Sequence, residues 1–462
     1  MLTVEKIGGT SMSQFGEVLK NIMLRDPKAV YGRVYVVSAY AGVTNELLEH
    51  KKTGAPGIYA KFAQGESYAG AMDALTSKLQ AINQELQPLG LDLAKADGFI
   101  EKRMRDLKAY LDSMRHVLAS GYLARDNVLL AAREMLAAVG EAHSAFNSAE
   151  ILRAKGHAPW FMDLSGFDDD ESWTIDERIH RMFQDVDPSK QIVIVTGYTK
   201  GVEGIMREFD RGYSEVTFSK VAVELEADEA IIHKEFHLSS ADPALVGAGN
   251  TVTVGQTNYD VADQLADVGM EAIHPKAAKP LEMAGIPIRL KNTFEPEHPG
   301  TLITKSYVGK SARVEVIAGT QKVTIVDIHD PSMVGAVGFD FGILETLKKH
   351  GVSYILKATN ANSITHVIPD KAAKASLIEE LKSRYQLVTT MPAAVVCVIG
   401  TNIAIPGVLA RAANVLAENK INVICVSQSY RQINMQFVID RADYKKAVAA
   451  LNAALCLNGG SR

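Results

Sequence analysis

The sequence predicts an α/β domain with a mostly parallel central sheet, followed by two small ferredoxin-like βαββαβ modules. Short apolar runs alternate with helical patterns up to residue 300, which is typical of α/β domains. Beyond residue 310 the chain repeats itself with an offset of about 70 residues. Each copy reads strand, helix, strand, strand, helix. We therefore expect domains at 1–300, 301–390 and 391–462, with residues 301–315 alternatively pairing with the last domain.

Three apolar runs of the first domain end in turns that contain glycine. Residues 2–7 lead into Gly8-Gly9, residues 33–37 into a turn over 38–42, and residues 191–195 into Thr196-Gly197. Each run is expected to form a strand. Ligands of open α/β sheets bind beyond the carboxyl ends of the strands, so we expect these three turns to assemble one site.

Helices are expected to cover this sheet. Residues 46–133 are polar and rich in helix-favouring residues, with an interruption at 54–57, and an apolar helix is expected over 135–152. A second cluster of proline and glycine at 295–300 marks the end of the first domain.

The two C-terminal modules are recognised by laying the chain against itself. Gly338 falls on Gly407, the expected helix 339–349 falls on 408–419, and the expected strand 364–368 falls on 435–439. The second helix has apolar residues on one face, as an amphipathic helix covering a sheet requires.

Composition excludes several classes of partner. The chain has 462 residues, of which 47% are hydrophobic and 22% are charged, and its formal net charge is -5. It lacks the basic field that attracts nucleic acid or anionic membranes. Three cysteines without a CxxC spacing favour a reducing compartment. We expect a cytoplasmic protein without a nucleic-acid or membrane partner.

The turn after Lys6 indicates the chemistry of the site. Lys6 stands two residues before Gly8-Gly9, where the backbone can approach a ligand without obstruction by side chains. Amide groups and a mobile ammonium suit a phosphoryl group during its transfer. A surface lysine before a tight turn is the alternative interpretation of this segment by itself.

Four segments in order resemble the aspartate kinases. They are Lys-Ile-Gly-Gly-Thr-Ser-Met at 6–12, Ser-Ala-Tyr-Ala-Gly-Val-Thr-Asn at 38–45, Gly-Glu-Ala-His-Ser at 140–144, and the segment 292–303. The C-terminal modules resemble the ACT domains that follow the kinase domain in this family. The resemblance implies the three-layer amino acid kinase fold and transfer of the γ-phosphoryl group of ATP, with Mg²⁺, to the β-carboxylate of L-aspartate.

The resemblance also implies a role for individual residues. Glu141 matches the acid that engages the amino group of aspartate, although a solvated charge on a helix is its alternative. Arg211 matches the arginine that grips the substrate carboxylate, a role suited to its planar fork. The remaining candidates are Lys6, Gly8, Gly9 and Thr10 for phosphate, and Ser38, Thr44, Ser214 and Glu215 for aspartate.

The sequence departs from the family pattern in two places. The usual Gly-Arg-Gly-Gly-Ser-Asp is here Asp-Arg-Gly-Tyr-Ser-Glu at 210–215, so Tyr213 replaces a glycine. The nucleotide segment at 233–244 keeps Asp242 but loses other family residues, and Lys234 either replaces a missing arginine or is solvated. His274 matches a turn near the nucleotide or is purely structural. The exchanges at Ile7, Met12 and Tyr213 resemble the aspartate kinases associated with ectoine synthesis.

The ACT modules imply regulation by an amino acid and assembly into a homodimer or higher homo-oligomer. Lysine-sensitive relatives carry acidic residues where this chain has Ile355 and Ala361, and burying an ammonium without a partner is costly. Threonine is therefore favoured over lysine as the effector. Two other functions stay open: a glutamate or acetylglutamate kinase, and a catalytically weak amino-acid sensor, which the altered segment 233–244 motivates.

Overall fold

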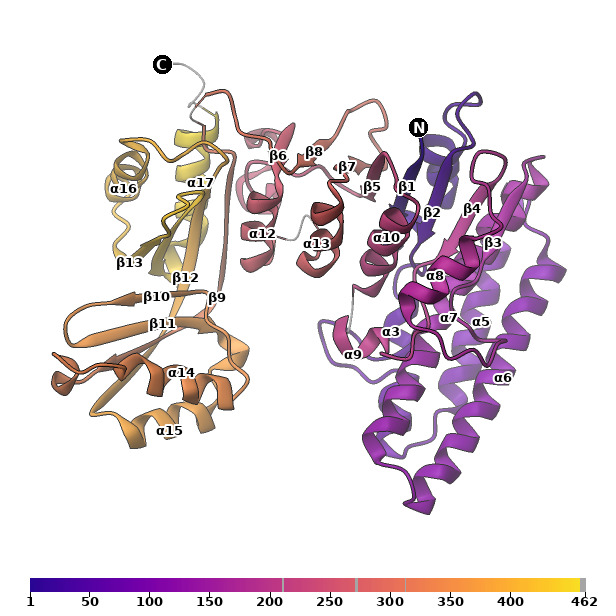
Figure 1. Cartoon of the computed structure of the whole chain (residues 1–462), viewed down its shortest axis with the longest axis horizontal. Coiled ribbons are helices and arrows are strands. Elements are labelled where there is room, and N and C mark those ends of the chain that lie inside the picture. Colours follow the sequence, from indigo (N-terminus) through magenta and orange to yellow (C-terminus); the bar gives the residue numbers. More distant parts are fainter. Residues whose placement is uncertain (210–211, 271–272, 312, 458–462) are drawn as a thin grey trace. The chain divides into compact units, whose positions relative to one another are not determined.

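The computed structural model describes residues 1–209, 212–270, 273–311 and 313–457. The chain forms two compact units (Figure 1). The first comprises Met1–His237 and Lys276–Gly300, and the second comprises Leu238–Pro275 and Thr301–Arg462.

The first unit is built on a parallel sheet in the order β3-β4-β2-β1-β5-β7. Its central strands carry β-branched and other apolar residues and are buried, as expected for strands covered on both faces. The three predicted strands are therefore confirmed as neighbours, and their carboxyl ends share one edge. The strands are β1 (Thr3–Ile7), β2 (Arg33–Val37), β3 (Pro159–Met162), β4 (Ile192–Thr196), β5 (Glu229–Lys234) and β7 (Ile288–Asn292).

Long helices cover this sheet. Helix α7 packs on β2, β3 and β4, with α5 and α6 packed alongside (Figure 1), whereas α10 packs on β1, β2 and β5. Asp92 caps the first turn of α6 by accepting a hydrogen bond from the backbone N–H of Lys95. The helices are α1 (Gly9–Met12), α2 (Phe15–Val18), the π-helix η1 (Leu19–Met23), α3 (Val43–Leu47), α4 (Ile58–Gln64), α5 (Ala69–Leu86), α6 (Leu93–Ser120), α7 (Arg125–Ala154), α8 (Ile175–Phe183), α9 (Ile205–Phe209), α10 (Tyr213–Glu224) and α13 (Pro275–Ala284).

In the described part of the second unit, six strands form an antiparallel sheet in the order β10-β11-β9-β12-β14-β13. One βαββαβ module runs from β9 through α14, β10, β11 and α15 into β12. The second runs from β12 through α16, β13, β14 and α17, and the first part of β9 pairs with it. The elements are β9 (Val316–His329), α14 (Phe339–Lys349), β10 (Leu356–Thr359), β11 (Ser363–Pro369), α15 (Ala375–Arg384), β12 (Leu387–Ile399), α16 (Val408–Glu418), β13 (Val423–Gln428), β14 (Asn434–Asp440) and α17 (Tyr444–Leu451).

Each module has its own apolar core, one including Ile343 and Leu347 of α14 and the other Ala412 and Leu416 of α16. The predicted ferredoxin-like repeat is therefore confirmed.

The segment Leu238–Pro275 belongs to the second compact unit. Ala241 lies in the core beneath α16 and α17, and Leu245 and Val246 pack against it. The segment contains α11 (Pro243–Val246), β6 (Gln256–Asn258) and α12 (Tyr259–Asp267), and β6 pairs in parallel with β8 (Thr301–Thr304). The boundary expected at residue 300 stays a prediction. Within the described ranges, no helix is both long and apolar enough to cross a membrane.

Candidate functional site

Five of the predicted site residues come together at the carboxyl ends of the parallel strands. Lys6 Nζ lies 3.2 Å from Oε1 of Glu215. The Ser214 hydroxyl donates a 2.7 Å hydrogen bond to Oε1 of Glu141, and the Ser38 hydroxyl lies 3.5 Å from that of Ser214. We call these five residues the Glu141 cluster. It joins β1, the turn after β2, α7 and the start of α10.

A glycine allows α7 to bring Glu141 to this position. A Cβ atom at Gly140 would lie 2.7 Å from Cβ of Ala39 and 3.0 Å from Cγ1 of Val43, too close for any other residue. The helix therefore approaches the turn after β2 closely. One helical turn further on, Ser144 donates a 2.9 Å hydrogen bond to the carbonyl oxygen of Ser38 and fixes that turn.

Two further glycines have close neighbours around the cluster. A Cβ atom at Gly197 would lie 2.9 Å from Cβ of Ser214 and 3.0 Å from Oε1 of Glu141. A Cβ atom at Gly9 would lie 2.6 Å from the carbonyl oxygen of Ala39. Gly197 was not among the predicted site residues, although its turn was expected to contribute. The predicted turn after β4 contains Gly197 and was the sequence signal that could have identified this residue.

Burial controls the charge of Glu141. Its side chain is only 2% exposed, and burial raises its pKa to about 8, against the opposing effects of the Ser214 hydrogen bond and the Lys6 charge. Its Oε2 atom has no hydrogen-bond partner within the described residues. The site thus contains a buried carboxyl group with a spare acceptor oxygen, which suits an incoming ammonium group.

Tyr213, which replaces the family glycine, packs inside the protein. It is buried, its ring centroid lies 5.8 Å from that of Tyr198 in an edge-on contact, and its hydroxyl lies 3.5 Å from the carbonyl oxygen of Ala137. Tyr198 in turn donates a 2.6 Å hydrogen bond to Glu134. The exchange therefore fills space between α10 and α7, a consequence that the sequence did not reveal.

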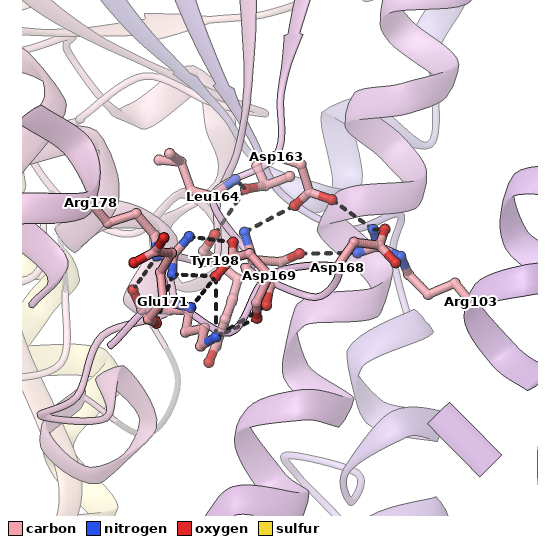
Figure 2. Close-up of polar contacts among 12 residues, drawn as sticks. Arg103, Asp163, Leu164, Asp168, Asp169, Glu171, Arg178 and Tyr198 are labelled. Carbon is pink, nitrogen blue, oxygen red and sulfur yellow. Dashed lines mark hydrogen bonds and ion pairs between the residues drawn. The ribbon is translucent and has the colours of Figure 1, made fainter. Parts of the chain in front are cut away.

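Buried arginines fix the neighbouring loops (Figure 2). Arg178 is fully buried and donates to both carboxylate oxygens of Asp169 at 2.8 and 2.9 Å, while its Nε donates to the carbonyl oxygen of Lys200 at 2.9 Å. Figure 2 shows a second network around Arg103 beside it. Arg178 thereby joins the segment that follows β3, through Asp169, to the segment that follows β4, through Lys200.

Comparison with known proteins identifies the family. Residues 1–292 match the model of the amino acid kinase family, and residues 396–455 match an ACT domain. The chain is 46% identical over 466 residues to the aspartate kinase Ask_Ect of Stutzerimonas stutzeri, with 98% of this chain and 97% of that protein covered. This chain belongs to the aspartate kinases. It is also 25% identical over 480 residues to the chloroplastic aspartokinase 1 of Arabidopsis thaliana, covering 99% of this chain and 80% of that protein.

Solved structures agree on the fold. The aspartate kinase of Clostridium acetobutylicum matches with a TM-score of 0.70 at 22% identity, covering 98% of this chain and 99% of that one. Aspartokinase III of E. coli in complex with aspartate and ADP matches with a TM-score of 0.73 at 21% identity, covering 98% and 100%.

The remaining predicted residues of this aspartate kinase belong to other elements of the chain or lie outside the described residues. Thr10 is exposed in α1, and Thr44 is half-buried in the first turn of α3. Lys234 ends β5, and its carbonyl oxygen accepts a 2.8 Å hydrogen bond from the N–H of Thr293. Arg211 lies outside the described residues.

Two candidate nucleotide contacts belong to the second compact unit. Asp242 accepts a 2.8 Å hydrogen bond from the N–H of Ala244 and caps α11, so a structural role is already evident for its carboxylate. His274 precedes α13 and is half-buried. Their roles toward the nucleotide stay predictions.

Proposed function

We propose that this aspartate kinase transfers the γ-phosphoryl group of ATP to the β-carboxylate of L-aspartate, giving 4-phospho-L-aspartate, and that the Glu141 cluster binds the amino acid. The observation that supports this assignment best is the buried Glu141 carboxyl, with one oxygen bonded to Ser214 and the other without a hydrogen-bond partner in the described structure. A buried acceptor of this kind is stabilised by an ammonium group.

Substrate positioning supplies most of the catalysis in this proposal. The β-carboxylate of aspartate is ionised at neutral pH and attacks directly, so no general base is required. Glu141 receives the α-ammonium, while the hydroxyls of Ser38, Thr44 and Ser214 donate to carboxylate oxygens. Arg211 is proposed to grip the substrate carboxylate through paired hydrogen bonds.

Lys6 and the Gly8-Gly9 backbone form the phosphate side of the proposed site. In the described structure Lys6 is neutralised by Glu215, at 3.2 Å, and is therefore held at the strand end where the phosphoryl group is expected. Mg²⁺, when bound with ATP, draws negative charge from the phosphate oxygens. Glu215, which pairs with the Lys6 ammonium, is proposed to accept the substrate ammonium when aspartate is bound. Thr10 and Lys234 complete the proposed nucleotide contacts.

A hydroxylamine-trapping assay tests the proposed reaction. The enzyme is incubated with MgATP and, separately, with aspartate, glutamate or acetylglutamate, because an acyl phosphate reacts with hydroxylamine to give a coloured hydroxamate. Hydroxamate with aspartate alone is the expected result. Product with glutamate or acetylglutamate instead would identify a different amino acid kinase. Failure with every substrate would support an amino-acid sensor.

We further propose that the ACT modules bind an amino-acid effector, threonine rather than lysine, and join two chains into a dimer. Ile355 is half-buried and Ala361 is exposed, and neither offers a carboxylate to a lysine ammonium. Val337, just before α14, and Phe341, in the first turn of α14, are largely exposed and favour association. The cytoplasmic location and the link to ectoine synthesis stay predictions.

A further inference from the structure

A cavity of about 640 Å³ lies in the first unit, away from the Glu141 cluster. Glu5 of β1, Arg33 of β2, His233 of β5 and Lys291 of β7 line one side of it. Successive residues of a strand point to opposite faces of the sheet, so Glu5 and Lys6 face in opposite directions. The cavity is therefore distinct from the phosphate side of the catalytic site.

The negative charge of Glu5 is already satisfied inside the cavity wall. Arg33 donates to its two oxygens at 2.6 and 3.0 Å, and Nε2 of His233 lies 2.7 Å from Oε2. The Thr3 hydroxyl adds a 2.9 Å hydrogen bond to Oε1. Four contacts on one buried carboxylate leave little capacity to neutralise other cations nearby.

Two further cations converge on one neutral oxygen. Lys291 Nζ lies 3.3 Å from the carbonyl oxygen of Pro296, and Nη1 of Arg25 donates to the same oxygen. The Arg25 guanidinium also pairs at 2.8 Å with Glu297, but that carboxylate is 88% exposed and its attraction is screened by solvent. The other carboxylate of the lining, on Asp26, accepts from the N–H of Lys28.

Lys291 has no ion pair within the described residues. Burial and the neighbouring Arg25 charge lower its pKa, and the charges of Glu5 and Glu229 only partly oppose this shift. Two cations that share a carbonyl group could each bind an oxyanion more favourably than they bind that neutral oxygen.

We propose that this cavity binds a small organic oxyanion between Arg25 and Lys291. Its volume lies in the range of small-molecule sites. Ile22, Tyr31 and Ile231 supply apolar surface beside the two cations, so the lining suits an anionic head group with a short organic body. Carboxylate and phosphate groups share the required chemistry.

Titration calorimetry on the full chain tests this site, with inorganic phosphate and succinate as separate probes at constant ionic strength. Lys291→Met and Arg25→Met are each expected to weaken binding of at least one probe about tenfold or more, since each removes a charged hydrogen bond. Lys291→Arg is expected to retain binding. Lys20→Met is the matched control, because Lys20 is an exposed lysine on the nearby η1 outside the cavity lining.

A Lys6→Met variant separates this site from the catalytic one. Anion binding at the catalytic turn is lost in Lys6→Met and kept in Lys291→Met. Anion binding in the cavity is lost in Lys291→Met and kept in Lys6→Met. The probe that binds more tightly distinguishes a phosphate-bearing ligand from a carboxylate. The proposal is overturned if all binding of both probes is lost in Lys6→Met. It is also overturned if Lys291→Met and Arg25→Met bind both probes as tightly as the unmodified chain does.

Discussion

The Ser214 hydroxyl donates a 2.7 Å hydrogen bond to Oε1 of Glu141, and this contact links the start of α10 to the middle of α7. Burial raises the pKa of the same carboxyl to about 8, so Glu141 is mostly protonated in the ligand-free enzyme at pH 7. An ammonium group that binds there must displace this proton. Protonation of Glu141 therefore couples substrate binding to pH.

Ser214→Ala is expected to raise the KM for aspartate about 2- to 10-fold, because the variant removes one hydrogen bond to the carboxylate. Loss of this donor also raises the pKa of Glu141 further, so the deficit should be larger at pH 7 than at pH 9. Steady-state kinetics at both values measure it. Ser219→Ala on the same helix is the control, since its hydroxyl has no hydrogen-bond partner among the described residues. An equal KM in the two variants would contradict the assigned role of Ser214.

Lys6→Ala is expected to lower kcat about 100-fold or more while changing the aspartate KM far less, since the ammonium acts on charge that develops during transfer. Steady-state kinetics with aspartate varied at saturating MgATP measure both constants. Lys20→Ala, an exposed lysine on η1, is the control. Equal effects of Lys6→Ala on kcat and KM would contradict the assignment of Lys6 to the transferring phosphoryl group.

Arg178→Met is expected to lower the free energy of unfolding by about 3 kcal/mol, because it removes a buried cation that makes two hydrogen bonds to Asp169 and one to the carbonyl oxygen of Lys200. Urea denaturation measures the change. Arg181→Met on the same helix is the matched control, since Arg181 is exposed and is expected to change stability by less than about 0.5 kcal/mol. Equal losses in the two variants would exclude an anchoring role for the network.

Threonine is expected to inhibit the enzyme at concentrations where lysine has no effect. Titrating each amino acid separately into the hydroxamate assay, at an aspartate concentration near its KM, measures this difference. Ile355→Asp places a carboxylate in the first module and is expected to increase the response to lysine. Inhibition of the unmodified chain by lysine alone would refute the effector assignment.

Much of the fold could be predicted because local patterns determine it. The apolar runs that become β1, β2 and β4 and the repeated helices α14 and α16 are encoded by residues close in sequence. Four ordered segments likewise located Lys6 and Glu141. These features need no knowledge of distant contacts.

Features that depend on distant contacts could not be predicted. Glu5 contacts Arg33, 28 residues away in the sequence, and His233, 228 residues away. His233 begins the segment 233–244, which departs from the family pattern, and its Nε2 lies 2.7 Å from Oε2 of Glu5. Tyr213 fills space beside Tyr198, and the segment Leu238–Pro275 joins the second unit. Both features depend on residues distant in the sequence, so no local pattern indicates them.

Isothermal titration of aspartate in buffers with different ionisation enthalpies tests the role of Glu141 most directly. The pKa of about 8 predicts release of close to one proton per aspartate bound at pH 7, since the ammonium stabilises the ionised carboxylate. Apparent affinity should therefore rise as the pH approaches 8. Glu141→Gln should bind aspartate at least about tenfold more weakly and release no proton from this group. Unchanged affinity and proton release in Glu141→Gln would contradict the assignment of Glu141 as the ammonium-binding residue.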